Sequence, residues 1–292
     1  MSLAGTVRTE AVMGTLVTIQ VVRAGAEDAI DRAFGWFHEI EARCTRFDEQ
    51  SELMQLTAHA GVAVAASPIL FEAVRFALQV AEETGGAFDP TVGKPMEARG
   101  HNREHRSGAA IRTAVPAGGA SFRDVEIDVG RHTIQLHRPL VLDLGAVAKG
   151  LAIDTAAREL ASFPDFAIDA GGDLYLAGSS PRGEPWSVGI RHPGHEVELL
   201  ATLRVSGQAI CTSGTYERGS HILDGRTGAP AEGVASATVV APGAMLADAL
   251  ATAAFVLGPT AGIELLYRMG VDGLIVTSEL QRYATQGLRN AA

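Results

Sequence analysis

Cysteine and positive charge are both scarce in this chain. Its 292 residues include only two cysteines, Cys44 and Cys211, which stand far apart and in no spacing typical of a metal site. Nothing in the sequence supports a disulfide, so we expect two free thiols in the core. Lys and Arg number 24 against 34 Asp and Glu, which gives a formal charge of −10 without any basic run. Nucleic-acid binding needs a cationic footprint, so the composition argues against that class.

Long hydrophobic runs and targeting signals are also missing. No apolar run reaches the roughly 20 residues of a membrane span, and no internal repeat or low-complexity tract occurs. The start of the chain, MSLAGTVRTEAVMGT, has no basic region followed by an apolar run, so no signal peptide is visible. Two locations stay open, namely the cytoplasm or an exported chain whose signal has been removed.

What is present is the composition of a globular protein with a substantial core. Hydrophobic residues make up 47% of the chain and charged residues 20%. The length suits one unit over residues 1–292, or two packed sub-domains within it. Apolar periodicity predicts helices over 27–44, after Ser67-Pro68 and over 244–258, and β-branched runs predict strands through the middle, including 139–145. Strands and helices in separate blocks predict an α+β fold with a mixed strand-rich core. We expect residues 97 to 120 to form a surface loop, with or without a short helix.

Two polar residues interrupt the most apolar predicted helix, AMLADALATAAFVLG. Asp248 and Thr252 are four residues apart, so their side chains lie on one face of that helix. A carboxylate on a buried helix is costly unless it is paired or binds a cation. The alternative is an exposed Asp and a Thr hydroxyl that bonds back into the helix. Together the two residues offer the hard oxygen ligands that Mg²⁺ prefers.

Three glycine-containing segments suit a phosphate or a flat ligand. In LDLGAVAKGLAID, a helix begins near Gly145, and its free N–H groups with Lys149 favour a phosphate, although a solvated Lys is the commoner outcome. The pair Gly171-Gly172 either lets a ligand lie against bare backbone or forms a plain hairpin turn. The segment GGAFDPTVGKP, with Phe88 and Asp89, is a candidate contact or a turn-rich loop.

One histidine stands among turn residues in CTSGTYERGSHILDGRTG. His221 lies between Ser213-Gly214 and the Asp224-Gly225 turn, and no G-x-S-x-G elbow accompanies it. Taken alone, a histidine before an apolar pair is more often structural than catalytic. Arg226 either serves a phosphate or pairs with Asp224.

The order of these segments resembles the ApbE family of FAD:protein FMN transferases, formerly called thiamine biosynthesis lipoproteins. The resemblance extends from Met13 to about Gly258 and rests on eight motifs in the order of that family. The motifs are MGT at 13–15, SEL at 51–53, GAFDPTVG at 86–93, DLGAVAKG at 143–150, AGGD at 170–173, TSG at 212–214, HILDGRTG at 221–228 and ADALATA at 247–253. Their joint order is far more specific than any one of them.

The resemblance implies an α+β fold with a central FAD cleft. It also implies Mg²⁺-dependent transfer of FMN from FAD to a Thr or Ser hydroxyl of a partner redox subunit, with release of AMP. The implied Mg²⁺ ligands are Asp248, Thr252 and the backbone carbonyl of Ala146, and the implied general base is His221. The residues implied for the FAD site are Met13, Ser51, Glu52, Phe88, Asp89, Lys149, Gly171, Gly172 and Ser213. Because an acidic chain repels a pyrophosphate, this reaction requires the cation.

Two positions depart from the motifs of the family. Thr57 stands where S-E-L-x-x-L-N ends in asparagine, and Gly225 stands where proline is common. Because a Thr hydroxyl is shorter than an amide, Thr57 leaves room for a water that hydrolyses FAD, or else it merely packs at a helix end. Besides the transferase, two functions stay open: an FAD pyrophosphatase that yields FMN and AMP, and a non-catalytic flavin-binding protein. The retained metal and base residues count against the second.

Overall fold

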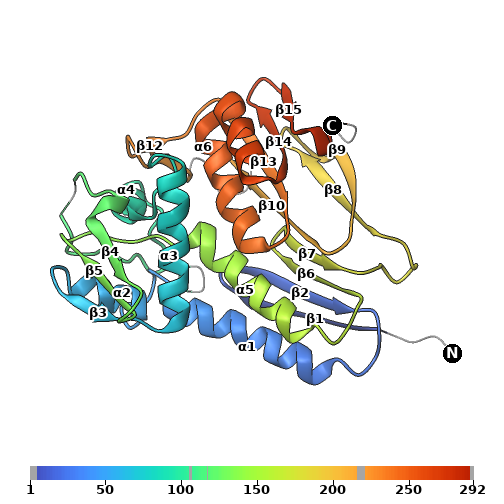
Figure 1. Cartoon of the computed structure of the whole chain (residues 1–292), viewed down its shortest axis with the longest axis horizontal. Coiled ribbons are helices and arrows are strands. Elements are labelled where there is room, and N and C mark those ends of the chain that lie inside the picture. Colours follow the sequence, from blue (N-terminus) through green and yellow to red (C-terminus); the bar gives the residue numbers. More distant parts are fainter. Residues whose placement is uncertain (1–4, 105–106, 117, 216–220, 290–292) are drawn as a thin grey trace. The chain divides into compact units, whose positions relative to one another are not determined.

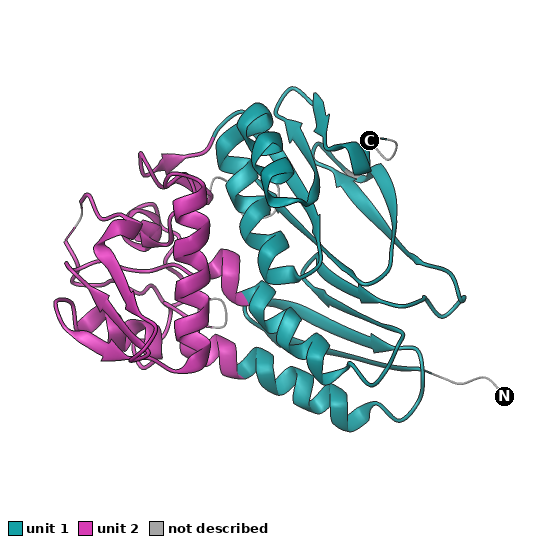
Figure 2. Cartoon of the chain, in the orientation of Figure 1, with its two compact units in different colours: residues 1–38, 149–219, 232–292 teal, residues 39–148, 220–231 magenta. Residues whose placement is uncertain are grey.

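The computed structural model describes residues 5–104, 107–116, 118–215 and 221–289. The chain divides into two compact units, drawn in different colours in Figure 2. Unit 1 comprises Met1–His38, Lys149–Gly219 and Glu232–Ala292, and unit 2 comprises Glu39–Ala148 and Ser220–Ala231. Each unit is assembled from segments that lie far apart in the sequence.

Unit 1 is built on an eight-stranded sheet in which all neighbours are antiparallel (Figure 1). In spatial order the strands are β1 (Thr6–Val12), β2 (Thr15–Val21), β6 (Phe166–Ala170), β7 (Asp173–Ala177), β10 (Gln208–Gly214), β13 (Val234–Ala241), β14 (Asp272–Thr277) and β15 (Arg282–Ala284). Successive side chains of a strand point to opposite faces, and β2 accordingly buries Val17, Ile19 and Val21 completely. The short 3₁₀ helix η3 (Gln286–Leu288) follows the last strand.

Both faces of this sheet are covered. The long helix α6 (Ala244–Met269) packs against β10, β13 and β14. A separate hairpin of β8 (Trp186–His192) and β9 (His195–Val205) covers the other face of these strands. There Ile190 and Leu203 of the hairpin join Ile210 and Leu274 of the sheet in one apolar cluster. The core of unit 1 therefore extends through three layers.

Helix α6 is the most apolar helix of the chain. Its length, and a mean hydropathy of 1.6 over an 18-residue stretch, make it long and apolar enough to cross a membrane. This corrects the expectation that no segment is long enough. Half of this 18-residue stretch is buried within the fold. The helix breaks at Gly258, whose φ is 79°, before Pro259. We interpret α6 as a core helix, because its apolar surface already has the sheet as its partner.

Unit 2 combines short helices with small sheets. Its helical elements are α2 (Glu52–Ala58), α3 (Pro68–Glu83), η1 (Pro90–Val92), α4 (Gly93–Ala98) and η2 (Phe122–Asp124). A three-stranded sheet has the order β3 (Ala63–Ala65), β5 (Thr133–Leu136), β4 (Val125–Asp128), and β11 (Leu223–Asp224) pairs with β12 (Ala229–Pro230). Helices α1 (Glu27–Cys44) and α5 (Gly145–Glu159) contribute residues to both units.

The α+β prediction is confirmed, and so are most of the predicted helices. Helix α1 has the predicted bounds, and α3 begins where Ser67 accepts a hydrogen bond from the amide of Leu70 at 3.3 Å. Apart from the end of α4 and a bridge between Arg103 and Ala110, the described residues from 97 to 120 contain no helix or strand. Both cysteines are buried free thiols, as expected.

The strand predicted over 139–145 is wrong. Leu140, Val141 and Leu142 are buried as expected, but this segment is an irregular connector. The amide of Asp143 donates to the carbonyl of Pro90 at 2.7 Å, and Gly93 donates to the carbonyl of Val141 at 3.2 Å. Its backbone is therefore satisfied by a helical segment, which a hydrophobic pattern does not distinguish from a neighbouring strand.

Candidate functional site

Two tight turns at one end of the unit 1 sheet carry three of the predicted site residues. Met13-Gly14 joins β1 to β2 and Gly171-Gly172 joins β6 to β7, with positive φ at all four residues. A Cβ on Gly171 would lie 2.2 Å from the hydroxyl of Thr15, so only glycine fits there. Met13 has a φ of 53°, which costs a non-glycine residue about 1 kcal/mol, and such residues cluster at functional sites.

A buried group of three charges follows directly after the second turn. Lys149 of α5 forms ion pairs with Asp173, the first residue after Gly172, and with Asp248 of α6, whose Oδ2 lies 3.5 Å from Nζ. The side chains of Lys149, Asp173 and Asp248 are 18%, 7% and 9% exposed. This trio, the Lys149 centre, excludes both a solvated Lys149 and an exposed Asp248. Two carboxylates and one ammonium leave it with an excess of negative charge.

Hydroxyl groups extend the Lys149 centre along α6 and β10. Thr252, one helical turn after Asp248, lies with its Oγ1 2.9 Å from Oγ of Ser213. The amide of Thr212 donates to Oδ1 of Asp173 at 3.1 Å. Carboxylate and hydroxyl oxygens on a negatively charged centre are the donor set that a hard cation such as Mg²⁺ prefers. The residues present therefore fit the implied metal.

The start of α6 is held by a carboxylate from α5. Asp154 accepts hydrogen bonds from the amides of Ala244 at 2.6 Å and Met245 at 3.0 Å. Burial raises the pKa of Asp154, and these two amide bonds oppose the rise. The helices also touch at Gly150, where a Cβ would lie 2.5 Å from the carbonyl oxygen of Ala244. These contacts fix the position of Asp248 relative to Lys149.

In unit 2, the predicted FAD residues Ser51 and Glu52 make internal contacts. Ser51 caps α2 by accepting the amide of Met54 at 3.1 Å and donates to the carbonyl of Thr45 at 2.6 Å. Glu52 accepts the amide of Ser67 at 2.6 Å and its hydroxyl at 2.7 Å. The S-E-L motif thus connects the first turn of α2 with the N-cap of α3.

Phe88 and Asp89 form a buried loop in the same unit. Phe88 is 6% exposed, and Asp89 accepts the amide of Thr91 at 2.8 Å and the amide of Phe122 at 2.9 Å. Burial raises the pKa of Asp89, while the bonds from Thr91 and Phe122 counteract it. A Cβ on Gly225 would lie only 2.3 Å from Cβ of Asp89. Glycine at position 225 therefore allows the Asp224-Gly225 turn to pack closely against the loop that contains Asp89.

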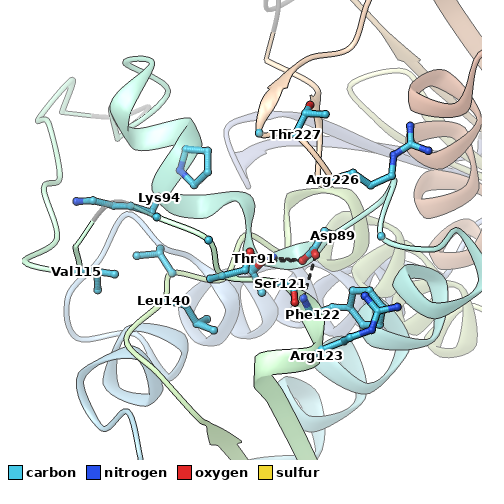
Figure 3. A pocket seen from close by; sticks show the side chains of 18 of the residues that line it. Asp89, Thr91, Lys94, Val115, Ser121, Phe122, Arg123, Leu140, Arg226 and Thr227 are labelled. Atoms are coloured by element: carbon cyan, nitrogen blue, oxygen red, sulfur yellow. Dashed lines mark hydrogen bonds between the residues drawn. The ribbon is translucent and has the colours of Figure 1, made fainter.

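A cavity of about 460 Å³ lies beside Asp89 (Figure 3). Lys94, Arg123 and Arg226 line it, and Asp89 is the one predicted site residue among its walls. Figure 3 shows the carboxylate of Asp89 bonded to the neighbouring loop. Arg226 pairs with Asp224 at 2.7 Å, as one alternative expected, and this pairing lowers the pKa of Asp224. The cavity is thus a polar hollow in which two of these three cations, Lys94 with Glu97 and Arg226 with Asp224, form ion pairs.

His221 lies in unit 2, and its ring is 6.3 Å from that of His101. His101 also accepts a hydrogen bond from Arg46 through its carbonyl, and Arg46 forms a buried ion pair with Asp143. Burial alone would raise the pKa of Asp143, but Arg46, the amide of Gly145 and the charge interaction with His221 lower it below its usual value. Ala146 is half-buried in the first turn of α5.

The structure supports the packing alternative for Thr57. The residue is buried in α2, and its hydroxyl donates to the carbonyl of Leu53 at 3.1 Å. A Thr side chain that bonds back to its own helix satisfies itself locally. The departure at this position is therefore accommodated within the helix.

The predicted residues fall into two groups. Unit 1 holds Met13, Lys149, Gly171, Gly172, Ser213, Asp248 and Thr252, and direct contacts join Lys149 to Asp248 and Ser213 to Thr252. Unit 2 holds Ser51, Glu52, Phe88, Asp89, Ala146 and His221. Sequence reasoning missed Asp173, Asp154, Arg46 and Asp143 as functional candidates. Asp173 had a usable signal, because it directly follows the glycine pair and begins an apolar strand.

Comparison with known proteins places the chain in a family. The sequence model described as "ApbE family" matches residues 13–275. The FAD:protein FMN transferase of Treponema pallidum is 32% identical over 96% of this chain and 87% of that protein. The one of Rhodobacter capsulatus is 33% identical over 95% of this chain and 56% of that protein. The crystal structure of the ApbE protein from Thermotoga maritima aligns with a TM-score of 0.86 and 27% identity over 98% of this chain and 99% of that one. The chain belongs to the ApbE family.

Proposed function

We propose that this protein transfers the FMN half of FAD to a Thr or Ser hydroxyl of a partner redox protein and releases AMP. The observation that carries the proposal is the Lys149 centre, where two buried carboxylates share one ammonium. Such a centre is unfavourable as a purely structural element, because it keeps a net negative charge away from water. Membership of the ApbE family and the names of its relatives support the same reaction.

Asp248 and Thr252 would hold a Mg²⁺, together with the backbone carbonyl of Ala146. When bound, this ion neutralises negative charge on the pyrophosphate as the bond breaks. Lys149 contributes a further positive charge on a stem that α5 holds in place. Gly171-Gly172 offers bare backbone to the ligand, since no described atom beyond the chain neighbours lies within 4 Å of a Cβ built on Gly172.

The other predicted contacts have direct or supporting roles. Met13, at its strained turn, and Ser213, beside Thr252, contact the flavin nucleotide. In unit 2, Phe88 supplies an apolar contact. Ser51, Glu52 and Asp89 hold the surrounding helices and loops, because their polar atoms are occupied by internal hydrogen bonds.

The reaction forms one bond and breaks one. The oxygen of the acceptor hydroxyl bonds to the phosphorus of the FMN half, and the bond from that phosphorus to the bridging oxygen breaks, so that AMP leaves with the electron pair. His221 accepts the proton of the hydroxyl, because imidazole is the side chain most often used as a general base. Phosphoryl transfer depends mainly on positioning and charge stabilisation.

The test mixes purified protein with FAD, Mg²⁺ and an acceptor that carries one target Thr. A transferase yields AMP and flavin-labelled acceptor in a one-to-one ratio, and a Thr-to-Ala version of the acceptor stays unlabelled. A pyrophosphatase yields AMP and free FMN, and a carrier yields neither. Flavin fluorescence of the acceptor on a denaturing gel, with AMP measured by chromatography, separates the three functions.

A variant pair tests the metal assignment within that assay. Asp248→Ala is expected to abolish Mg²⁺-dependent turnover while the protein stays folded. The matched control is Glu184→Ala, which removes a carboxylate that is 61% exposed and pairs with Arg204 at the surface. Full turnover in EDTA, or in Asp248→Ala, contradicts the assignment.

Hydrolysis as a second activity has a specific test at Thr57. Because the Thr57 hydroxyl is bonded to Leu53 within its own helix, we expect Thr57→Asn to leave the ratio of AMP released to acceptor labelled unchanged. A ratio that falls toward one only in the asparagine variant would show that Thr57 admits water to the reaction.

A further inference from the structure

The β8–β9 hairpin of unit 1 has an irregular end. His192, the last residue of β8, pairs with His195, the first residue of β9, across the turn Pro193-Gly194. An unbroken ladder would next pair Arg191 with residue 196, but Arg191 pairs with Leu199 instead. Three extra residues of β9, 196–198, therefore bulge from the ladder. Bulges of this kind redirect side chains and occur beside functional sites.

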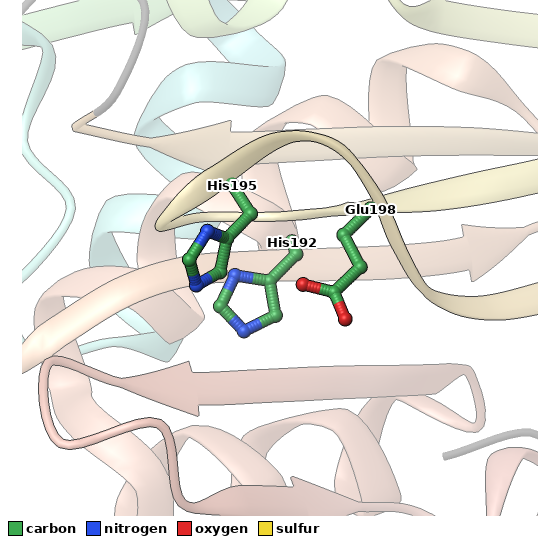
Figure 4. A group of neighbouring side chains, drawn as sticks. All are labelled: His192, His195 and Glu198. Carbon is green, nitrogen blue, oxygen red and sulfur yellow. The ribbon is translucent and has the colours of Figure 1, made fainter.

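The bulge brings a carboxylate to the two histidines. One potential ligand atom each from His192, His195 and Glu198 lies within 4.8 Å of the others. Figure 4 shows the three side chains on the same side of the hairpin end, with the ring of His192 between His195 and Glu198. The two imidazole centroids are 4.8 Å apart. In a regular strand, side chains three residues apart, such as those of His195 and Glu198, point to opposite faces. The extra residues are therefore what brings Glu198 to the side of the two histidines.

We propose that His192, His195 and Glu198 form a binding site for a divalent transition metal of the Zn²⁺ class, separate from the magnesium ligands. Imidazole nitrogen with a carboxylate oxygen is a ligand set for Zn²⁺ and similar ions, whereas Mg²⁺ prefers oxygen ligands alone. Tetrahedral bonds of about 2.0–2.1 Å place ligand atoms roughly 3.3 Å apart. The three groups therefore need to approach by only about 1.5 Å, within the range of a rotamer change for half-buried and exposed side chains.

One internal hydrogen bond influences how His192 binds. The amide of Gly194 donates to Nδ1 of His192 at 3.0 Å, which orients the ring beside the turn. Coordination through Nδ1 exchanges this exposed hydrogen bond for a bond to the metal. Water would complete the fourth position, because the described side chains supply three protein ligands here. The site is thus of the open type.

The base of the hairpin gives the site a firm support. Ile190, two residues before His192, and Leu200, two residues after Glu198, are both buried in the cluster that joins the hairpin to the sheet. Their fixed positions limit how far the ligand-bearing segments separate. A bound metal would therefore cross-link β8 to β9 at the end where the ladder is broken. Val197 in the bulge is 98% exposed, so this end has little apolar packing of its own.

The test is a titration of the full chain, free of any affinity tag, with Zn²⁺ in saturating Mg²⁺. We expect one equivalent of Zn²⁺ to bind in wild type and to raise the unfolding temperature, since a ligand of the native state alone stabilises it. His195→Ala and Glu198→Gln should each weaken Zn²⁺ binding at least about tenfold. The matched control is His38→Ala. His38 also lies beside a carboxylate, that of Glu10 at 3.1 Å, but this pair contains one histidine and not two.

Two results would overturn the proposal. One is wild type that takes up no Zn²⁺ in Mg²⁺ buffer. The other is Zn²⁺ binding that survives in His195→Ala and is lost in Asp248→Ala, because Zn²⁺ would then occupy the proposed magnesium ligands. If the site is where we place it, Asp248→Ala keeps the Zn²⁺ affinity of wild type.

Discussion

The Lys149 centre makes a prediction about stability that does not depend on any assay of flavin chemistry. Replacing Lys149 with methionine keeps an unbranched side chain but removes the ammonium between Asp173 and Asp248. The two carboxylates, 7% and 9% exposed, are then left without a cation. Removing one partner of a buried ion pair costs about 3–5 kcal/mol. Because Lys149 is itself 18% exposed, water reaches part of the centre, so we expect the lower end, about 3 kcal/mol.

The measurement is the free energy of unfolding in urea, in EDTA and then in Mg²⁺. In EDTA, Lys149→Met should lose about 3 kcal/mol and Lys149→Arg considerably less. The control Arg204→Met breaks a pair that is 61% exposed on both sides, and should change stability by less than about 1 kcal/mol. Mg²⁺ should stabilise Lys149→Met more than wild type, because it compensates the orphaned carboxylates.

The reasoning is refuted if the free energy of unfolding of Lys149→Met in EDTA lies within about 1 kcal/mol of the wild-type value, because a surface ion pair contributes that much. It is also refuted if the loss is large but Mg²⁺ stabilises variant and wild type equally. The second result would mean that Asp173 and Asp248 do not share a site that a cation can enter.

Three further predictions concern unit 2. His221→Ala should keep FAD affinity and slow transfer by about a hundredfold or more, the scale of a lost general base; a collapse of FAD affinity in equilibrium binding would make His221 a binding residue. Arg46→Met should destabilise by about 3–5 kcal/mol at neutral pH. Since the pKa of Asp143 is lowered in the fold, the stability it contributes is present above its unfolded value of about 3.9 and is lost as the pH falls through its folded value. The gap between wild type and Arg46→Met should therefore narrow below about pH 4, and a gap independent of pH would contradict this account. Gly225→Ala should lower the free energy of unfolding by about 1–3 kcal/mol, because the new Cβ would lie 2.3 Å from Cβ of Asp89. An unchanged free energy of unfolding in urea would disprove the clash.

Local signals in the sequence predicted much of the fold. The N-cap Ser67 with Pro68 marks the start of α3, and Gly258-Pro259 marks the break in α6. These features depend on residues within one or two turns of each other, so periodicity and capping rules detect them. The strand predicted over 139–145 failed because a strand needs a distant partner, and the partner here is the turn at Pro90.

The site was harder to predict because its contacts are long-range. Lys149 and Asp248 are 99 residues apart in the chain, and Asp154 and Ala244 are 90 apart. Spacing alone left Asp248 undecided between an exposed and a buried carboxylate. The decision came from tertiary packing, which buries α6 on the sheet and brings α5 against its first turn. Resemblance to a family supplied the order of the motifs, but it did not single out Asp154 or Asp173.

The cap that α5 provides for α6 also affects which parts of the chain can change in length. Lys149 and Asp154 lie on one continuous helix, and Asp154 holds the amides of Ala244 and Met245. Two helical spans and this cap therefore help to set the separation of Lys149 from Asp248. Insertions in the exposed turn at residues 181–185, ahead of β8, would cost only loop-closure entropy, about 0.6 kcal/mol per doubling of loop length. This turn, next to the β8–β9 hairpin, is where such a protein can acquire new surface features while its charged centre keeps the same dimensions.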